Sequence, residues 1–148
     1  MTSSFTTNKG FEQPAPGDYV NAWATPVNNN WDAIDNSLGG TSEINVTATA
    51  GPIITLQESQ YQPPNIEIFG TLAVNLNYQL PTGVGGMWSI SNTTTGNFTV
   101  TFSIAAGNAI VLNQGRQLIV SDGATLEPDA RSPWIGSSPI RGPSGQRK

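Results

Sequence analysis

Near the start of the chain, apolar side chains recur at intervals of four, three and four residues, which is the spacing of one face of a helix. This apolar stripe consists of Val27, Trp31, Ile34 and Leu38. Thr25 precedes it as the expected N-cap, with Pro26 at the first helical position, where its missing N–H costs nothing. Gly39-Gly40 is a typical helix end. The pattern predicts one short helix over about residues 26–38.

From residue 43 onward the hydrophobic period changes from 3.6 to two, which is typical of half-buried strands. Alternation is clearest in 44–48, 74–80 and 98–104, and shorter apolar runs occupy 53–56, 66–72, 87–91, 109–112 and 117–120. Segments rich in Gly, Asn, Pro and Thr separate these runs, as expected for turns. Seven or eight short strands at close spacing predict a mainly β fold, an antiparallel β-sandwich or a jelly-roll-like domain.

These patterns divide the chain into three parts. Residues 1–41 are expected to form an extended N-terminal docking arm that contains the short helix, and residues 42–126 the β-sandwich domain. Residues 127–148 are rich in Pro and Gly and predict an irregular, basic C-terminal tail.

The composition excludes several kinds of chemistry. The sequence has no Cys and no His, so disulfides, thiolate or imidazole metal ligands and His-dependent nucleophiles are absent. Acid–base chemistry would need a carboxylate pair, Asp32 with Asp35 or Asp122 with Glu127, and no sequence feature holds either pair in a dry cleft. The glycine-rich segment 83–86 leads into a strand, not a helix, and predicts a turn rather than a phosphate site. We expect no catalytic activity, no cofactor and no metal.

Charge is distributed unevenly along the chain. The 10 acidic and 6 basic residues give a net charge of −4, and no Lys or Arg occurs between Gly10 and Gly115. After residue 130 there is no acid, and the basic residues are Arg131, Arg141, Arg147 and Lys148. This pattern favours an electrostatically docked or solvated tail over nucleic-acid binding. The apolar runs are too short for a membrane helix, and residues 1–5 lack a signal-peptide pattern, so we expect a soluble or assembled protein.

The strand region lacks the Lys residues that usually guard exposed sheet edges, which favours edges covered by neighbouring subunits. The arm is also rich in large apolar residues, and Trp is enriched at interface centres. We therefore expect a homo-oligomer and a partner interface on the arm, with the alternative that the arm packs on its own sandwich. The expected interface residues are Phe5, Phe11, Tyr19, Trp23, Val27, Trp31, Ile34 and Leu38, with further tail contacts at Trp134, Ile135 and Arg141. Trp88 lies in a strand and is expected in the core.

Residues 10–40, GFEQPAPGDYVNAWATPVNNNWDAIDNSLGG, resemble the opening of tailed-bacteriophage virion proteins, especially tail-fibre and minor tail proteins. The later segments WSISN (88–92), FTVTF (98–102), VLNQG (111–115) and VSDG (120–123) are similar to the β domain that often follows. The resemblance spans roughly residues 10–125. It implies attachment to the tail through the N-terminal region and association of the β domains, with a trimer favoured.

The expected function is therefore that of a non-enzymatic structural subunit of a phage particle, in the tail rather than on the capsid surface. A chain of 148 residues is shorter than a complete fibre with a receptor-binding tip, which leaves adaptor, short fibre and capsid decoration protein open. A third class is a module that binds host-surface glycans. The feature that would distinguish such a module from a purely structural protein is an exposed aromatic side chain beside Asn and Asp. Tyr61 and Trp134 are the candidates for it.

Overall fold

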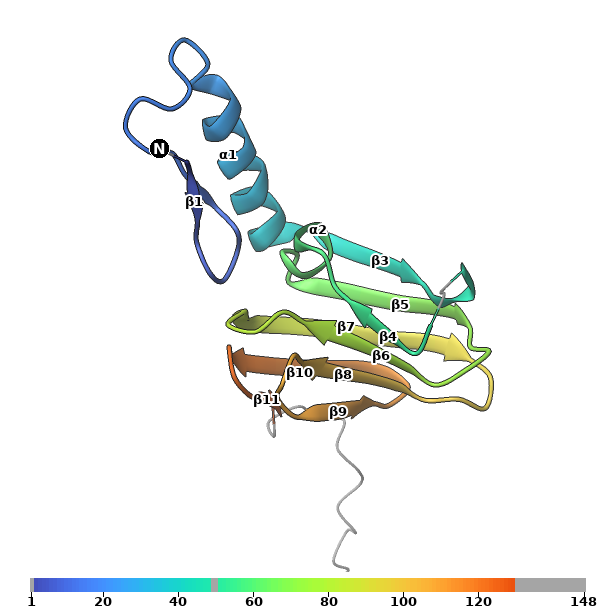
Figure 1. The fold of residues 1–148 in the computed structure, drawn as a ribbon. Coiled ribbons are helices and arrows are strands. Elements are labelled where there is room, and N and C mark those ends of the chain that lie inside the picture. The colour runs from blue at the N-terminus through green and yellow to red at the C-terminus, as the bar shows by residue number, and fades with distance from the viewer. Residues whose placement is uncertain (1, 49–50, 130–148) are drawn as a thin grey trace, which may run out of the picture.

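The computed structural model describes residues 2–48 and 51–129, and its fold is mainly β, as the alternation predicts (Figure 1). The helices are α1 (Ala24–Gly39), the 3₁₀ helix η1 (Val46–Ala48) and α2 (Glu58–Tyr61). The strands are β1 (Ser4–Phe5), β2 (Glu12–Gln13), β3 (Thr41–Asn45), β4 (Ile53–Thr55), β5 (Asn65–Thr71), β6 (Leu76–Leu80), β7 (Gly85–Thr95), β8 (Val100–Ile104), β9 (Ala109–Leu112), β10 (Gly115–Asp122) and β11 (Leu126–Pro128).

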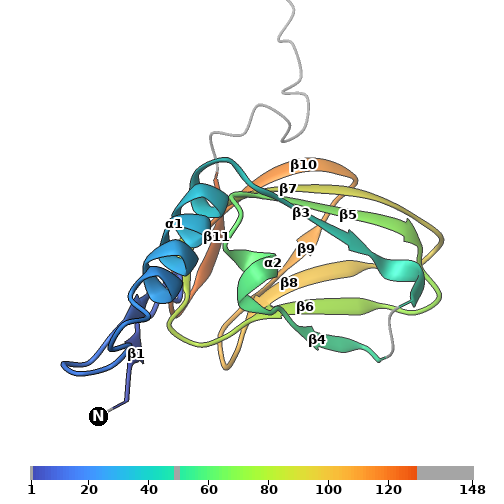
Figure 2. The ribbon, with the colours of Figure 1, turned by 90° about the horizontal axis from the view of Figure 1, so that it is seen from above.

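Two larger sheets face each other, and β1 and β2 form a separate two-stranded hairpin beside α1 (Figures 1 and 2). The five-stranded sheet has the order β11-β10-β7-β5-β3, and the four-stranded sheet has the order β4-β6-β8-β9. The prediction of purely antiparallel strands is wrong. Strands β3, β5 and β7 run parallel, as do β4, β6 and β8. The antiparallel pairs among the described strands are β7–β10, β10–β11, β8–β9 and β1–β2.

The parallel registers define an internal repeat of 24 residues. Thr41 pairs with Asn65 and Asn65 pairs with Ser89, a step of 24 each time, and the four-stranded sheet repeats the same step from Ile53 to Asn77. The chain therefore winds in coils, placing one strand of each coil in each sheet. A period of two is the same in parallel and antiparallel strands, so the alternation alone does not reveal this arrangement.

The core between the sheets is built from residues that stack from coil to coil. Leu56, Leu80 and Ile104 occupy the same point of successive coils, and each is at most 1% exposed. Trp88 is completely buried, as predicted, and its ring centroid lies 6.4 Å from that of Phe102. Because every coil contributes to one continuous cluster, the two sheets cannot separate without exposing it.

Helix α1 begins two residues earlier than predicted, and Thr25 is not its N-cap. The N-cap is Trp23, which makes no side-chain capping bond, and Thr25 lies within the first turn. The predicted end at Gly39-Gly40 is confirmed. Gly40 is needed for space rather than for a left-handed conformation, because a Cβ there would lie 2.7 Å from the carbonyl oxygen of Asn36.

Short strands and prolines protect the sheet edges. Edge strands β4 and β11 have three residues each; Pro52 precedes β4, and β11 ends at Pro128. Of the two remaining edges of the larger sheets, β3 carries the exposed Glu43 at its centre, and β9 has four residues with neither proline nor charge. Brevity, proline and an edge charge all disfavour pairing with another chain. The lack of Lys therefore does not by itself require a covering subunit.

The stacked leucines give a direct test of the coil core. We expect Leu80→Ala to lower the free energy of unfolding by about 2–5 kcal/mol, because a fully buried leucine is replaced by a cavity. The matched control, Val111→Ala on the exposed outer side of β9, should cost about 0.5 kcal/mol or less. Urea unfolding of both variants measures the difference, and equal losses would contradict the assignment of the core.

A second test uses the turn that follows β10. The Asp122 carboxylate accepts hydrogen bonds from the backbone N–H groups of Thr125 (2.7 Å) and Ala124 (2.8 Å), and these bonds hold its pKa below the usual 3.8. The resulting stabilisation is present above pH 3.8 and is lost as the pH falls through the lowered pKa. Asp122→Ala should therefore destabilise at neutral pH and matter progressively less under strong acid.

The control for this test is Asp122→Asn, which keeps a side-chain acceptor without the titration. It should retain more stability than Asp122→Ala at neutral pH and lose the acid-dependent component. Unfolding curves from pH 7 to pH 2 measure both, and a gap between wild type and Asp122→Ala that does not change with pH would contradict this account.

Candidate interaction surface

Helix α1 turns a small and polar stripe toward the rest of the chain and its apolar stripe toward solvent. Pro26 and Ala33 are buried. Asn30, which lies between them, and Ser37, which follows one turn later, are half-buried. The spacing of these inward residues is again four, three and four, offset by one residue from the apolar stripe. A helix that packed on its own domain would bury the apolar stripe. Because small residues occupy the inward face of α1, the larger apolar residues of the stripe are left exposed.

The exposed fractions quantify this for the predicted interface residues. Trp31 is 64% exposed and Leu38 79%, and three others are also exposed: Phe5, Trp23 and Val27. The remaining three are half-buried: Phe11, Tyr19 and Ile34. Val20, 72% exposed, belongs to the same part of the chain and is not among the predicted residues. The alternative in which Trp23 and Trp31 pack on their own domain is therefore wrong.

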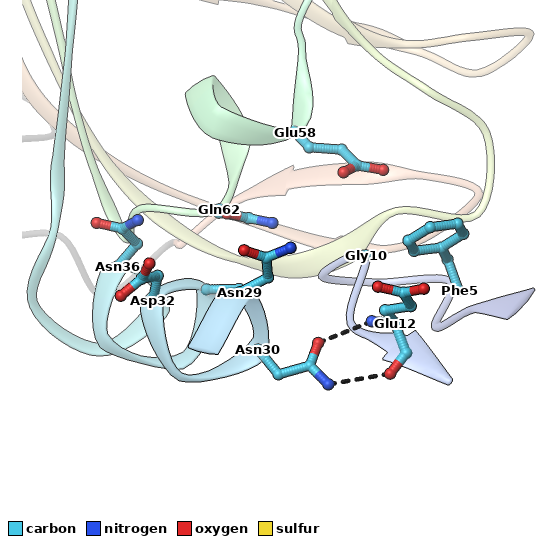
Figure 3. A pocket seen from close by; sticks show the side chains of 10 residues that line it. Phe5, Gly10, Glu12, Asn29, Asn30, Asp32, Asn36, Glu58 and Gln62 are labelled. Carbon is cyan, nitrogen blue, oxygen red and sulfur yellow. Dashed lines mark hydrogen bonds between the residues drawn. The ribbon is translucent and has the colours of Figure 1, made fainter. Parts of the chain in front are cut away.

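The β1–β2 hairpin fixes the direction of α1. The side-chain amide of Asn30 makes two hydrogen bonds with the backbone of Glu12: its Oδ1 accepts from the N–H (2.8 Å), and its Nδ2 donates to the carbonyl (3.0 Å) (Figure 3). The Glu12 carboxylate in turn accepts the Tyr19 hydroxyl (2.5 Å), and this bond raises the pKa of Tyr19. The polar stripe is thus used for positioning, so it is not available to a partner.

The tip of the hairpin docks on the β domain. The Lys9 ammonium donates to the carbonyl of Gln62 (3.0 Å), and the Gln62 side-chain amide donates back to the carbonyl of Lys9 (2.8 Å). The same ammonium lies 5.4 Å from the centre of the Trp88 ring, within the range of a cation–π contact. Beside it, Asn8 Oδ1 accepts the N–H of Gly85 (3.0 Å). Partial burial lowers the pKa of Lys9.

A polar cleft of about 280 Å³ opens between the hairpin, α1 and α2 (Figure 3). Its lining contains no basic residue and consists of Phe5, Gly10, Glu12, Asn29, Asn30, Asp32, Ala33, Asn36, Glu58 and Gln62. Asp32 faces this cleft and Asp35 is not part of it, so the structure does not bring that candidate carboxylate pair together there. The side chain of Asp32 has no hydrogen-bond partner among the residues that the structure describes.

The second candidate carboxylate pair shares a smaller cleft. Asp122 and Glu127 line a space of about 140 Å³ together with Val120 and Thr125. Backbone hydrogen bonds from Thr125 and Ala124 lower the pKa of Asp122 and favour its ionised form, which has no proton to donate. Within the predicted glycine-rich segment, Gly83 lies in the turn between β6 and β7, and Gly85 and Gly86 already belong to β7, so the segment leads into a strand as expected.

The structure contradicts one of the two predicted glycan-binding residues, and the predicted residues of the tail lie outside the part of the chain that it describes. Tyr61 is only 5% exposed and cannot offer its ring to a sugar. The pKa of the Tyr61 hydroxyl is raised, mainly by burial and secondly by the nearby Glu58 carboxylate. Trp134, Ile135 and Arg141 lie outside the described residues.

Within residues 2–48 and 51–129, no group of three or more His, Cys, Asp or Glu side chains is arranged to hold a metal ion. Over the same residues, no helix is both long and apolar enough to cross a membrane. Comparison with known proteins found no matching family model, no matching curated protein and no matching solved structure.

The hairpin contact generates a prediction about Lys9. Lys9→Met keeps the length of the side chain but removes the hydrogen bond to Gln62 and the cation above Trp88, interactions worth about 1 kcal/mol together. We expect the backbone amides of β1 and β2 to exchange faster with deuterated solvent in this variant. Arg116→Met, a substitution of an exposed base, is the control and should leave their exchange unchanged. Identical exchange in Lys9→Met and wild type would show that Lys9 does not hold the hairpin.

Proposed function

We propose that this chain is a non-enzymatic structural subunit of a tailed-phage particle, a tail fibre or tail adaptor protein that attaches through its N-terminal arm. The observation that carries the proposal is the outward apolar stripe of α1, with Trp31 64% and Leu38 79% exposed. The resemblance of residues 10–40 to the openings of tail-fibre and minor tail proteins supports the phage setting.

The energetics favour a partner on this surface. Complete burial of one large apolar side chain is worth roughly 1.5–3 kcal/mol, so several such side chains left in water represent a large unused stabilisation. Contiguous exposed apolar surface of this kind marks interaction sites. The arm is also positioned by specific hydrogen bonds to Glu12 and Gln62, so the stripe is presented in a fixed direction. A preorganised surface loses less entropy on binding.

Within this proposal, residues 42–126 form a sandwich-like domain carried by the arm, and copies of the chain associate, with a trimer favoured. The protein has no catalytic role, and its partners are other virion proteins. The alternative is a capsid decoration protein, since an arm that clamps onto neighbours serves both locations. The number of copies per particle separates the two, because decoration proteins are present in hundreds and tail subunits in far fewer.

The proposal is tested by incorporation into phage particles. We expect Trp31→Ala to lower incorporation roughly thirtyfold, corresponding to a central interface residue worth about 2 kcal/mol. Val111→Ala, which truncates an exposed residue of β9 far from α1 in the sequence, should incorporate normally. Arg141→Ala should have a smaller effect than Trp31→Ala. Quantitative immunoblots of purified particles measure all three variants, with circular dichroism to establish that each is folded.

Deletion of residues 1–40 is the stronger form of the same test. We expect the truncated chain to keep a β-type circular dichroism spectrum and to be absent from particles. It should also be less stable than the full chain, because the deletion removes Lys9 from Gln62 and Trp88. Normal incorporation of both Trp31→Ala and the truncated chain would place attachment elsewhere and contradict the proposal.

A further inference from the structure

The outward face of α1 has a candidate occupant within this same sequence. We infer that it binds residues 130–148 of a neighbouring copy of the chain. This rests on the proposed function to the extent that both place a partner on the arm, and it goes further by naming that partner.

The first argument is charge. The arm has the acidic residues Glu12, Asp18, Asp32 and Asp35, and its one base, Lys9, is directed inward to Gln62. Across the rest of the described chain the only other base is Arg116, on the five-stranded sheet. The described part of a second copy therefore offers almost no positive charge to match the arm. Residues 130–148 contain four bases and no acid: Arg131, Arg141, Arg147 and Lys148.

The second argument is the combination of apolar and charged groups. On α1, the exposed Trp31 and Leu38 are accompanied by the exposed carboxylate of Asp35, whereas Asp32, also exposed, lines the cleft toward the hairpin. In residues 130–148, the apolar pair Trp134-Ile135 stands between Arg131 and Arg141. A segment with an aromatic anchor and flanking arginines matches a surface with an apolar stripe and flanking acids.

The third argument is reach, and it selects a neighbouring copy. Strands β11 and β3 are at opposite edges of a five-stranded sheet, about 19 Å apart at about 4.8 Å per strand. Helix α1 joins β3 and extends beyond that edge (Figure 1), and Trp31 is about 14 Å further along the helix from Gly40. Trp134 comes five residues after Asp129, the last described residue, and that stretch spans at most about 18 Å. Trp134 therefore cannot reach Trp31 of its own molecule.

This contact is heterologous, because it joins different surfaces of the two copies. Such head-to-tail contacts close into rings when the rotation between copies allows it, and otherwise continue as filaments. It therefore also explains how identical copies could associate without using the protected edges of their sheets.

The absence of Cys makes the inference testable by single-cysteine cross-linking of the full chain. Asn28→Cys places a thiol on the exposed side of α1 next to Val27 without removing an acid. Ser137→Cys places one two residues after Ile135. The two variants are mixed in equal amounts with a mild oxidant, and the mixed disulfide dimer is followed by mass spectrometry. The control pair is Thr55→Cys, exposed on the four-stranded sheet, with Ser137→Cys.

We expect the Asn28/Ser137 dimer to form at least tenfold faster than the Thr55/Ser137 dimer. Trp134→Ala or Trp31→Ala should remove most of that difference, and 1 M salt should reduce it because charges are screened within about 3 Å. Equal rates for the two pairs would overturn the inference. A chain that carries both Asn28→Cys and Ser137→Cys gives a further test at high dilution. If its disulfide forms only within the chain, the occupant is the chain's own segment, and the inference is overturned.

The outcome is separable from that of the proposed function. Specific cross-linking of a protein that never enters particles would refute the phage assignment and leave this contact standing. Incorporation that depends on Trp31 but occurs without any specific cross-link to residue 137 would support attachment through the arm and refute this occupant.

Discussion

The 24-residue step between parallel partners is the constraint on which the rest of the structure depends. Each coil must return its chain to the same height so that Leu56, Leu80 and Ile104 stack between the two sheets. Parallel neighbours also require a long connection, which the facing strand of each coil supplies. The stack ends where β9, β10 and β11 turn back as antiparallel partners. Helix α1 leads directly into the β3 edge of this stack.

The position of the arm follows from that edge. Gly40 allows the close approach that ends α1 immediately before β3, and the hairpin tip reaches across to Gln62 and Trp88. Helix α1 is held along its inward face. There the Asn30 amide bonds to the backbone of the hairpin, and the small residues Pro26 and Ala33 are buried. Because polar contacts hold α1 in position, the apolar residues of its outward stripe are not needed for that purpose and stay exposed. Under the proposed function, this arrangement presents the apolar stripe to a partner in a fixed direction.

Much of this was predictable from the residue pattern, and the failures have physical causes. The helix, its end at Gly40 and the positions of most strands follow from local spacing and turn residues. Parallel pairing was missed because it depends on contacts 24 residues apart, which alternation does not encode. The final strand, β11, was missed because its three residues include Pro128 and show no apolar alternation.

The predicted interface illustrates the same limit. The spacing of Val27, Trp31 and Leu38 identifies one side of the helix but not whether that side faces the domain. The decision depends on the opposite stripe, where Ala33 and Asn30 fit against the hairpin. The Lys9 contact with Gln62 could not be anticipated, since it joins residues 53 apart in the sequence through two side chains and two backbone carbonyls.

The central claim is that the apolar face of α1 is open in the free chain and covered in the assembled particle. Hydroxyl-radical footprinting, read residue by residue by mass spectrometry, measures this directly for Trp31, with buried Trp88 as the internal reference. The account predicts rapid oxidation of Trp31 in the dilute, unassociated chain and strong protection in purified particles, with Trp88 protected in both. Protection of Trp31 in the unassociated chain, or equal oxidation of Trp31 in that chain and in particles, would contradict it.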